Sequence, residues 1–201
     1  MTTTCLLASK VQQYRNGFVS PINNKIGVIT SPSSTDIDKA LGLLIGDVKW
    51  YVGCHQWYLK LYPSVKNQMI NDIIRRKLWN IPLNKYNSFE DIYKDIRKWF
   101  SRNYIGQVTI YDITLRLLVA RNEVRLYPKD YVYVHARPAK AYKDLVAKGY
   151  ISRKLRKQND IIPIKEFRNA FGNLESYDIE DMLCQIGKGN IIIEGCNELN
   201  P

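Results

Sequence analysis

Residues 88–103, with the sequence SFEDIYKDIRKWFSRN, carry the clearest helical pattern in the chain. Ser88 and the acid three residues later, Asp91, form a variant of the capping box that begins many helices. Apolar side chains then recur at the three- and four-residue intervals of one helix face. They are Phe89, Ile92, Ile96 and either Phe100 or Trp99. The segment therefore predicts an amphipathic helix that has to bury one face against other parts of the fold.

Similar patterns recur along the rest of the chain. Gly149 favours the end of one of these helices, because glycine readily adopts the left-handed conformation that closes a helix. Residues 18–30 are expected to form a small β hairpin, and the segment after Tyr127 a turn followed by an extended stretch. Further helices are expected over residues 6–14, 33–46, 50–62, 64–80, 109–122, 138–149, 161–173 and 174–189.

The length and composition favour one mainly α-helical globular domain. The chain has 201 residues, of which 45% are hydrophobic, and this is enough for one packed core. Within this single domain we distinguish an N-terminal part (1–63), a hairpin and basic DNA-facing part (64–157), and C-terminal helices (158–201).

The charge of the chain is strongly positive and unevenly distributed. Lysine and arginine number 30 and aspartate and glutamate 19, a formal net charge of +11. Residues 129–157 hold nine cations and two acids, whereas residues 160–201 hold eight acids and three cations. A local basic block is typical of a surface that follows a phosphate backbone. We expect double-stranded DNA as the partner, with an anionic membrane surface or a merely basic surface as alternatives.

The cysteine, histidine and hydropathy patterns argue against a metal protein, a secreted protein and a membrane protein. Cys5, Cys54, Cys184 and Cys196 have no metal-site spacing, and we interpret them as free thiols of a cytoplasmic protein. No apolar run is long enough to span a bilayer, and the N-terminus lacks the features of a secretory signal. We expect a monomer without a metal or cofactor and without a membrane partner.

The segment YIGQVTIYDITLRLLVA, residues 104–120, resembles the hairpin and second helix of the helix-hairpin-helix DNA glycosylases. In that superfamily a glycine-containing turn precedes a helix whose free N–H groups bind a DNA phosphate. Gly106, Gln107 and Val108 match the turn, and Thr109 the first-turn hydroxyl, although Val108 replaces the second glycine. Downstream, VYVHAR (132–137) is similar to the family's V-D-T-H-V-x-R segment, with Tyr133 in place of the aspartate.

A second alignment is possible, in which IYDITLR (110–116) matches the catalytic segment. It places Asp112 on the catalytic aspartate and Arg116 on the arginine of that segment. The resemblance thus implies Asp112 and His135 as catalytic residues. Without the resemblance, Asp112 is interpreted as an acid in the first turn of a helix and Arg116 as its ion-pair partner on that helix. His135 is then interpreted as a structural histidine.

The resemblance implies a glycosylase that flips a modified base out of DNA and cleaves its N-glycosidic bond, leaving an abasic site. Phage defence by removal of modified cytosine is one such role. We expect no lyase activity, because no lysine is singled out as a Schiff-base nucleophile. The alternatives are a non-enzymatic DNA-binding protein with a basic helical face, and a helical adaptor for an acidic protein.

Two further sets of residues complete the predicted site. The aromatic walls of the base pocket are expected to be Tyr111, Tyr133, Trp57 and Tyr58. The DNA-binding residues are expected to be Gly106, Gln107, Val108, Thr109, Arg116, Arg137, Lys140, Lys143, Arg153, Lys154, Arg156 and Lys157.

Overall fold

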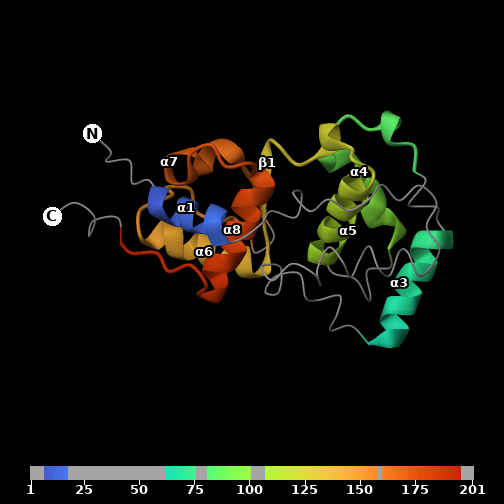
Figure 1. Ribbon diagram of the computed structural model, residues 1–201, viewed down its shortest axis with the longest axis horizontal. Coiled ribbons are helices and arrows are strands. Elements are labelled where there is room, and N and C mark those ends of the chain that lie inside the picture. Colours follow the sequence, from blue (N-terminus) through green and yellow to red (C-terminus); the bar gives the residue numbers. More distant parts are fainter. Residues whose placement is uncertain (1–6, 18–61, 76–80, 101–106, 158–159, 196–201) are drawn as a thin grey trace. The chain divides into compact units, whose positions relative to one another are not determined.

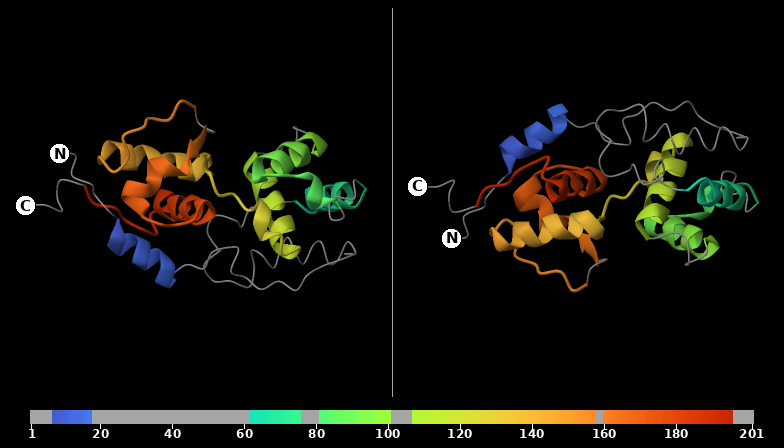
Figure 2. Two further views of the ribbon diagram at one scale, coloured as in Figure 1. Left: turned by 90° about the horizontal axis from the view of Figure 1, so that it is seen from above. Right: turned by 90° about the horizontal axis from the view of Figure 1, so that it is seen from below.

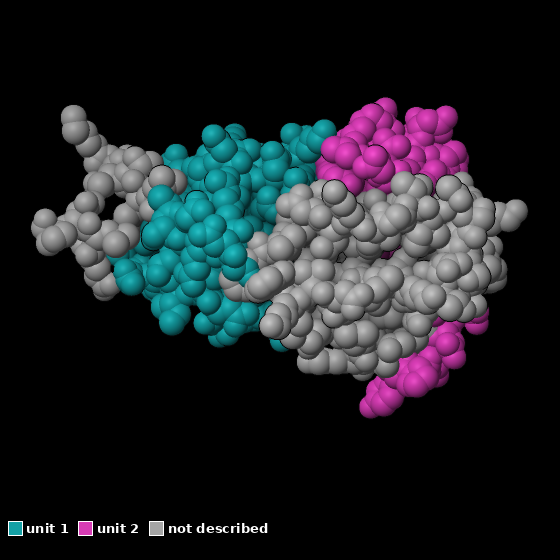
Figure 3. Space-filling model, viewed as in Figure 1, with its two compact units in different colours: residues 1–20, 128–201 teal, residues 21–127 magenta. Residues whose placement is uncertain are grey.

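The computed structural model describes residues 7–17, 62–75, 81–100, 107–157 and 160–195 (Figure 1). It confirms a mainly helical fold with a small two-stranded antiparallel sheet. Contacts within the chain define two compact units, which are coloured in Figure 3. Unit 1 comprises Met1–Ser20 and Pro128–Pro201, and unit 2 comprises Pro21–Tyr127. The boundary at residue 127 divides the expected DNA-facing part (64–157) between the two units.

Unit 1 is built around a strand, two long helices and a second strand. Its elements in chain order are α1 (Ala8–Gly17), β1 (Tyr131–Val134), α6 (Ala136–Ala147), β2 (Asp160–Pro163), η5 (Ile164–Phe167), α7 (Arg168–Phe171) and α8 (Ser176–Lys188). Helix α6 packs against α8, and α1 contacts α7 (Figures 1 and 2). The N–H of Leu7 donates to the carbonyl of Ala170 at 2.8 Å, which attaches the N-terminal segment to the rest of unit 1.

Strands β1 and β2 pair antiparallel, with Val132 opposite Ile162 and Val134 opposite Asp160. Because side chains alternate across a strand, these residues share one face of the sheet, and Val132, Val134 and Ile162 are fully buried in the core. The opposite face carries Tyr131 and Tyr133 of β1 and Ile161 and Pro163 of β2. Tyr131 and Ile161 are exposed, whereas Tyr133 is buried. The helix expected over 161–173 is therefore wrong at its start, since its first residues form β2. The β-branched pair Ile161 and Ile162 fits a paired strand better than a helix.

Unit 2 contains α3 (Pro63–Arg75), η3 (Leu83–Lys85), α4 (Phe89–Trp99), α5 (Gln107–Ala120) and η4 (Val124–Leu126). The capping prediction for α4 is confirmed, because the N–H of Asp91 donates to Ser88 Oγ at 3.2 Å. Helix α4 packs on α5, where the rings of Phe89 and Tyr111 meet edge to face at 5.2 Å. The expected β hairpin of residues 18–30 and the expected helices over 33–46 and 50–62 lie outside the described residues, apart from Tyr62.

Candidate nucleic-acid interface

Helix α6 presents a stripe of cations. Arg137, Lys140 and Lys143 are exposed and three residues apart, so they lie on one side of the helix. The other side buries residues such as Tyr142 and Leu145 against the core of unit 1. All three cations are thus exposed on α6, while their role in binding DNA stays a prediction.

The second half of the basic block follows α6 and turns back beside it toward β2 (Figure 2). The hydroxyl of Tyr142 donates to the carbonyl of Arg153 at 2.8 Å and so attaches this segment to α6. Asp160, at the start of β2, accepts from the N–H of Arg156 at 3.2 Å and from that of Ile161 at 3.0 Å. Two hydrogen-bonded anchors therefore hold the backbone on which Lys154, Arg156 and Lys157 are carried.

The Tyr142 anchor is a permanent donor at neutral pH. Burial raises the pKa of its phenol to about 12, so the hydroxyl keeps its proton. The same segment is held a second time by Arg153, whose Nη1 lies 3.9 Å from Glu166 Oε1. Arg153 is only half-buried, but Glu166 already lies beside its guanidinium. Arg153 is therefore expected to attract an external anion less strongly than the neighbouring cations do.

We group the exposed cations of these two stretches as one candidate interface, which we call the basic surface. It consists of Arg137, Lys140, Lys143, Lys154, Arg156 and Lys157. Within the described part of the chain, the last five make no ion pair with an acidic side chain. The nearby acid Asp144 is engaged by Lys148 at 3.3 Å. The positive charge of these five side chains is therefore available to a polyanion. Binding would release counterions condensed on that polyanion, which favours the complex.

The predicted phosphate-binding turn differs from what the structure shows. Gln107, Val108 and Thr109 are the first three residues of α5, so the expectation that Gln107 and Val108 form a turn before the helix is wrong. Gly106 lies outside the described residues. Residues of a first helical turn retain N–H groups without intrahelical acceptors, which is the feature that an anion would need.

Asp112 lies in α5, beyond its first turn, and that turn contains no acid. The explanation of Asp112 as a first-turn helix acid is therefore wrong. The side chains of Asp112 and Arg116 lie outside the described part, so their expected roles stay predictions. Asp112 also belongs to unit 2, whereas the second predicted catalytic residue, His135, belongs to unit 1.

His135 is enclosed at the start of α6, with 5% of its surface exposed. Its Nδ1 lies 3.8 Å from Oε1 of Glu180, a buried residue of α8. The next residue, Ala136, adopts a positive φ of 45° where the chain turns from β1 into the helix. This position suits an imidazole that holds the start of α6 against α8, the structural role considered from sequence.

The aromatic residues assigned to a base pocket are core residues where the structure describes them. Tyr111 is 1% exposed in unit 2 and Tyr133 is 4% exposed in unit 1. In this structure neither ring offers a face to a flipped base, and the two rings belong to different units. Trp57 and Tyr58 lie outside the described residues.

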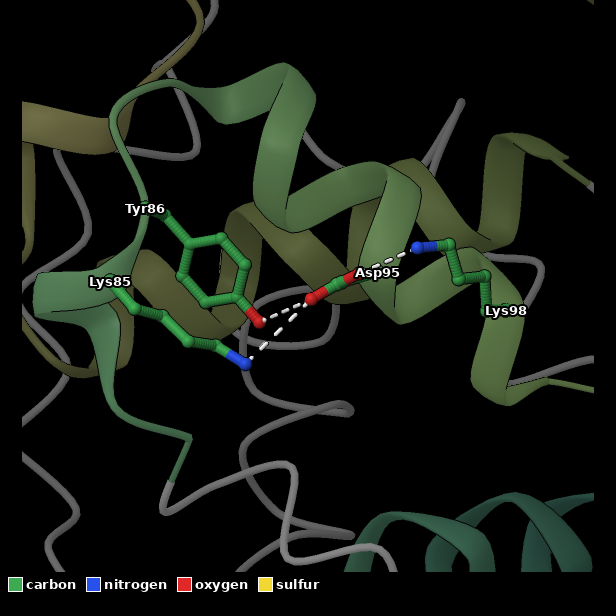
Figure 4. A network of polar contacts seen from close by, with 4 residues as sticks. All are labelled: Lys85, Tyr86, Asp95 and Lys98. Atoms are coloured by element: carbon green, nitrogen blue, oxygen red, sulfur yellow. Dashed lines mark hydrogen bonds and ion pairs between the residues drawn. The ribbon is translucent and has the colours of Figure 1, made fainter.

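Sequence reasoning missed a polar cluster in unit 2, which Figure 4 shows. Tyr86 donates to Asp95 Oδ2 at 3.0 Å, and Lys98 donates to Asp95 Oδ1 at 2.9 Å. The hydrogen bonds from Lys98 and Tyr86 lower the pKa of Asp95, and burial raises the pKa of Tyr86. The cluster joins η3 to α4, and its one carboxylate forms ion pairs with both Lys98 and Lys85. We interpret it as a structural cluster that adds little to a binding surface.

The expectation of free thiols is wrong at Cys184 in α8, because this residue is disulfide-bonded. The other three cysteines, Cys5, Cys54 and Cys196, lie outside the described residues. Disulfides are typical of oxidising compartments. The inference of a cytoplasmic location, which was drawn from free thiols, therefore loses its basis.

Two other expectations concern membranes and metals. None of the described helices has the length and apolar character needed to cross a bilayer. Among the described residues, histidine, cysteine, aspartate and glutamate side chains form no group of three or more that could hold a metal ion. Both findings apply to the described ranges alone.

Comparison of the chain with protein families, with curated proteins and with solved structures found no match. The basic surface and its geometry therefore carry the functional argument.

Proposed function

We propose that this protein binds double-stranded DNA, using the basic surface of unit 1 to contact the phosphate backbone. One observation carries the proposal: five exposed cations, on α6 and on the anchored segment after it, make no ion pair with an acid in the described ranges. Such cations contribute to DNA affinity by releasing condensed counterions. This is the non-enzymatic alternative considered from sequence.

Base excision stays a prediction that rests on the resemblance to helix-hairpin-helix glycosylases. The structure adds no support for it, because His135, Tyr111 and Tyr133 are buried and the side chain of Asp112 is outside the described part. Phosphate binding needs none of these residues. DNA binding is therefore the function that the described geometry supports best.

The proposal is tested by titrating a labelled duplex of about two helical turns with the full chain at several salt concentrations. If all six cations of the basic surface contact phosphates, the logarithm of the association constant falls linearly with that of the salt concentration, with a slope of about −5. A slope near zero, or no binding at ~50 mM salt, would contradict phosphate recognition.

A further inference from the structure

The block that supplies the basic surface also contains four tyrosines, and only one of them is exposed. Tyr133, Tyr142 and Tyr150 are buried, whereas Tyr131 is 39% exposed. It lies at the start of β1, on the sheet face that also carries the buried ring of Tyr133. Ile161, on the same face of the neighbouring strand and diagonal to Tyr131, is 42% exposed. We call these two exposed apolar side chains the apolar patch.

Cations stand at both ends of this patch. Arg156 and Lys157 precede β2 at the end of the ladder where Asp160 pairs with Val134. At the other end, Lys129 precedes Tyr131 and Lys165 follows Pro163, the residue paired with Tyr131; both lysines are exposed. The exposed acid Asp130 also lies at this end, so these two lysines and one acid together carry a net charge of +1.

The dimensions of the ladder suit a short stretch of a single strand. Each strand has four residues and spans about 10 Å between its first and last Cα atoms. Phosphates of a stacked strand follow one another at about 3.4 Å along its axis, so cations at the two ends would contact phosphates about three nucleotides apart. A base between them would lie within reach of the exposed ring of Tyr131.

We propose that Tyr131, at the exposed end of this face, stacks on an unpaired base of single-stranded DNA. The inference rests on the proposed function, since it assigns a second form of DNA to a site that shares Arg156 and Lys157 with the basic surface. An exposed aromatic ring flanked by cations is the arrangement by which proteins hold single strands without reading sequence. Bases within a duplex already stack on each other, so only an unpaired or extruded base offers its face to the ring.

The test compares wild-type protein with Tyr131→Leu and Tyr131→Phe, using single-stranded oligothymidylate and a duplex as the two probes. Loss of the ring in Tyr131→Leu is expected to weaken single-strand binding roughly 5- to 100-fold. Duplex affinity and the salt dependence of both probes should stay as in the wild type, because the ring carries no charge. Tyr131→Phe keeps the ring and should bind the single strand like wild type.

Tyr62→Leu is the matched control, since Tyr62 is an exposed tyrosine of unit 2. It should change neither affinity, and thermal melting shows whether each variant is folded. Unchanged single-strand affinity in Tyr131→Leu, or an equal loss on both probes, would overturn the stacking proposal. If the wild-type protein binds the duplex, either result overturns the stacking proposal alone. A wild-type protein that does not bind the duplex contradicts the proposed function.

Discussion

Replacing Lys154, Arg156 and Lys157 together with glutamine is expected to lower the affinity for duplex DNA by about two to three orders of magnitude at ~0.1 M salt. Each phosphate contact contributes about 0.9 to the salt slope, so three lost contacts should reduce its magnitude by about 3. The substitutions leave the fold in place, because the anchors of this segment are the carbonyl of Arg153 and the backbone N–H of Arg156. Fluorescence anisotropy over a range of salt concentrations measures both quantities.

A matched control removes the same charge from unit 2. Lys94, Arg97 and Lys98 are exposed on α4, and their joint replacement by glutamine changes the net charge by the same amount. Its salt slope should stay close to that of the wild type. If both triple variants lose affinity equally, binding depends on total charge, and the basic surface is not the interface.

Gly187→Ala is expected to destabilise unit 1 by about 1–3 kcal/mol, although alanine is the better helix former. A Cβ added at Gly187 would lie 2.5 Å from the carbonyl oxygen of Arg137. That oxygen belongs to the backbone at the start of α6 and cannot move without displacing the first turn. In a unit of this size, such a loss lowers the melting temperature by roughly 5–20 °C.

Gly17→Ala serves as the control for this substitution. Gly17 is the last residue of α1, and an added Cβ would find nothing within 4 Å. Its melting temperature should equal or slightly exceed that of the wild type. If Gly187→Ala is as stable as the wild type, then α8 and the start of α6 are packed less closely than this structure shows.

The features that sequence predicted well are those with local causes. Helix α4 begins where Ser88 caps it, because a cap and an amphipathic stripe are set by residues a few positions apart. The end of α6 is similar, since Gly149 adopts a φ of 82°. The cationic stripe of α6 also follows directly from helical spacing.

The features that sequence missed depend on distant contacts. Strand β2 forms because Ile161 and Ile162 pair with β1 almost thirty residues earlier, which overrides a local helical pattern. The division into two units joins α1 to the C-terminal helices, and no local signal marks it. Tyr131 and Tyr133 share one sheet face, yet Tyr131 is exposed and Tyr133 is buried, because their exposure depends on the tertiary surroundings and not on strand alternation.

Lysine footprinting of the full chain, with and without duplex DNA, locates the interface without any substitution. Acetylation followed by mass spectrometry reports which amines DNA covers. DNA contact through the basic surface predicts protection of Lys140, Lys143, Lys154 and Lys157, while Lys94 and Lys98 of unit 2 stay reactive. Protection of Lys94 and Lys98 with none on the basic surface would contradict the assignment of that surface as the DNA interface.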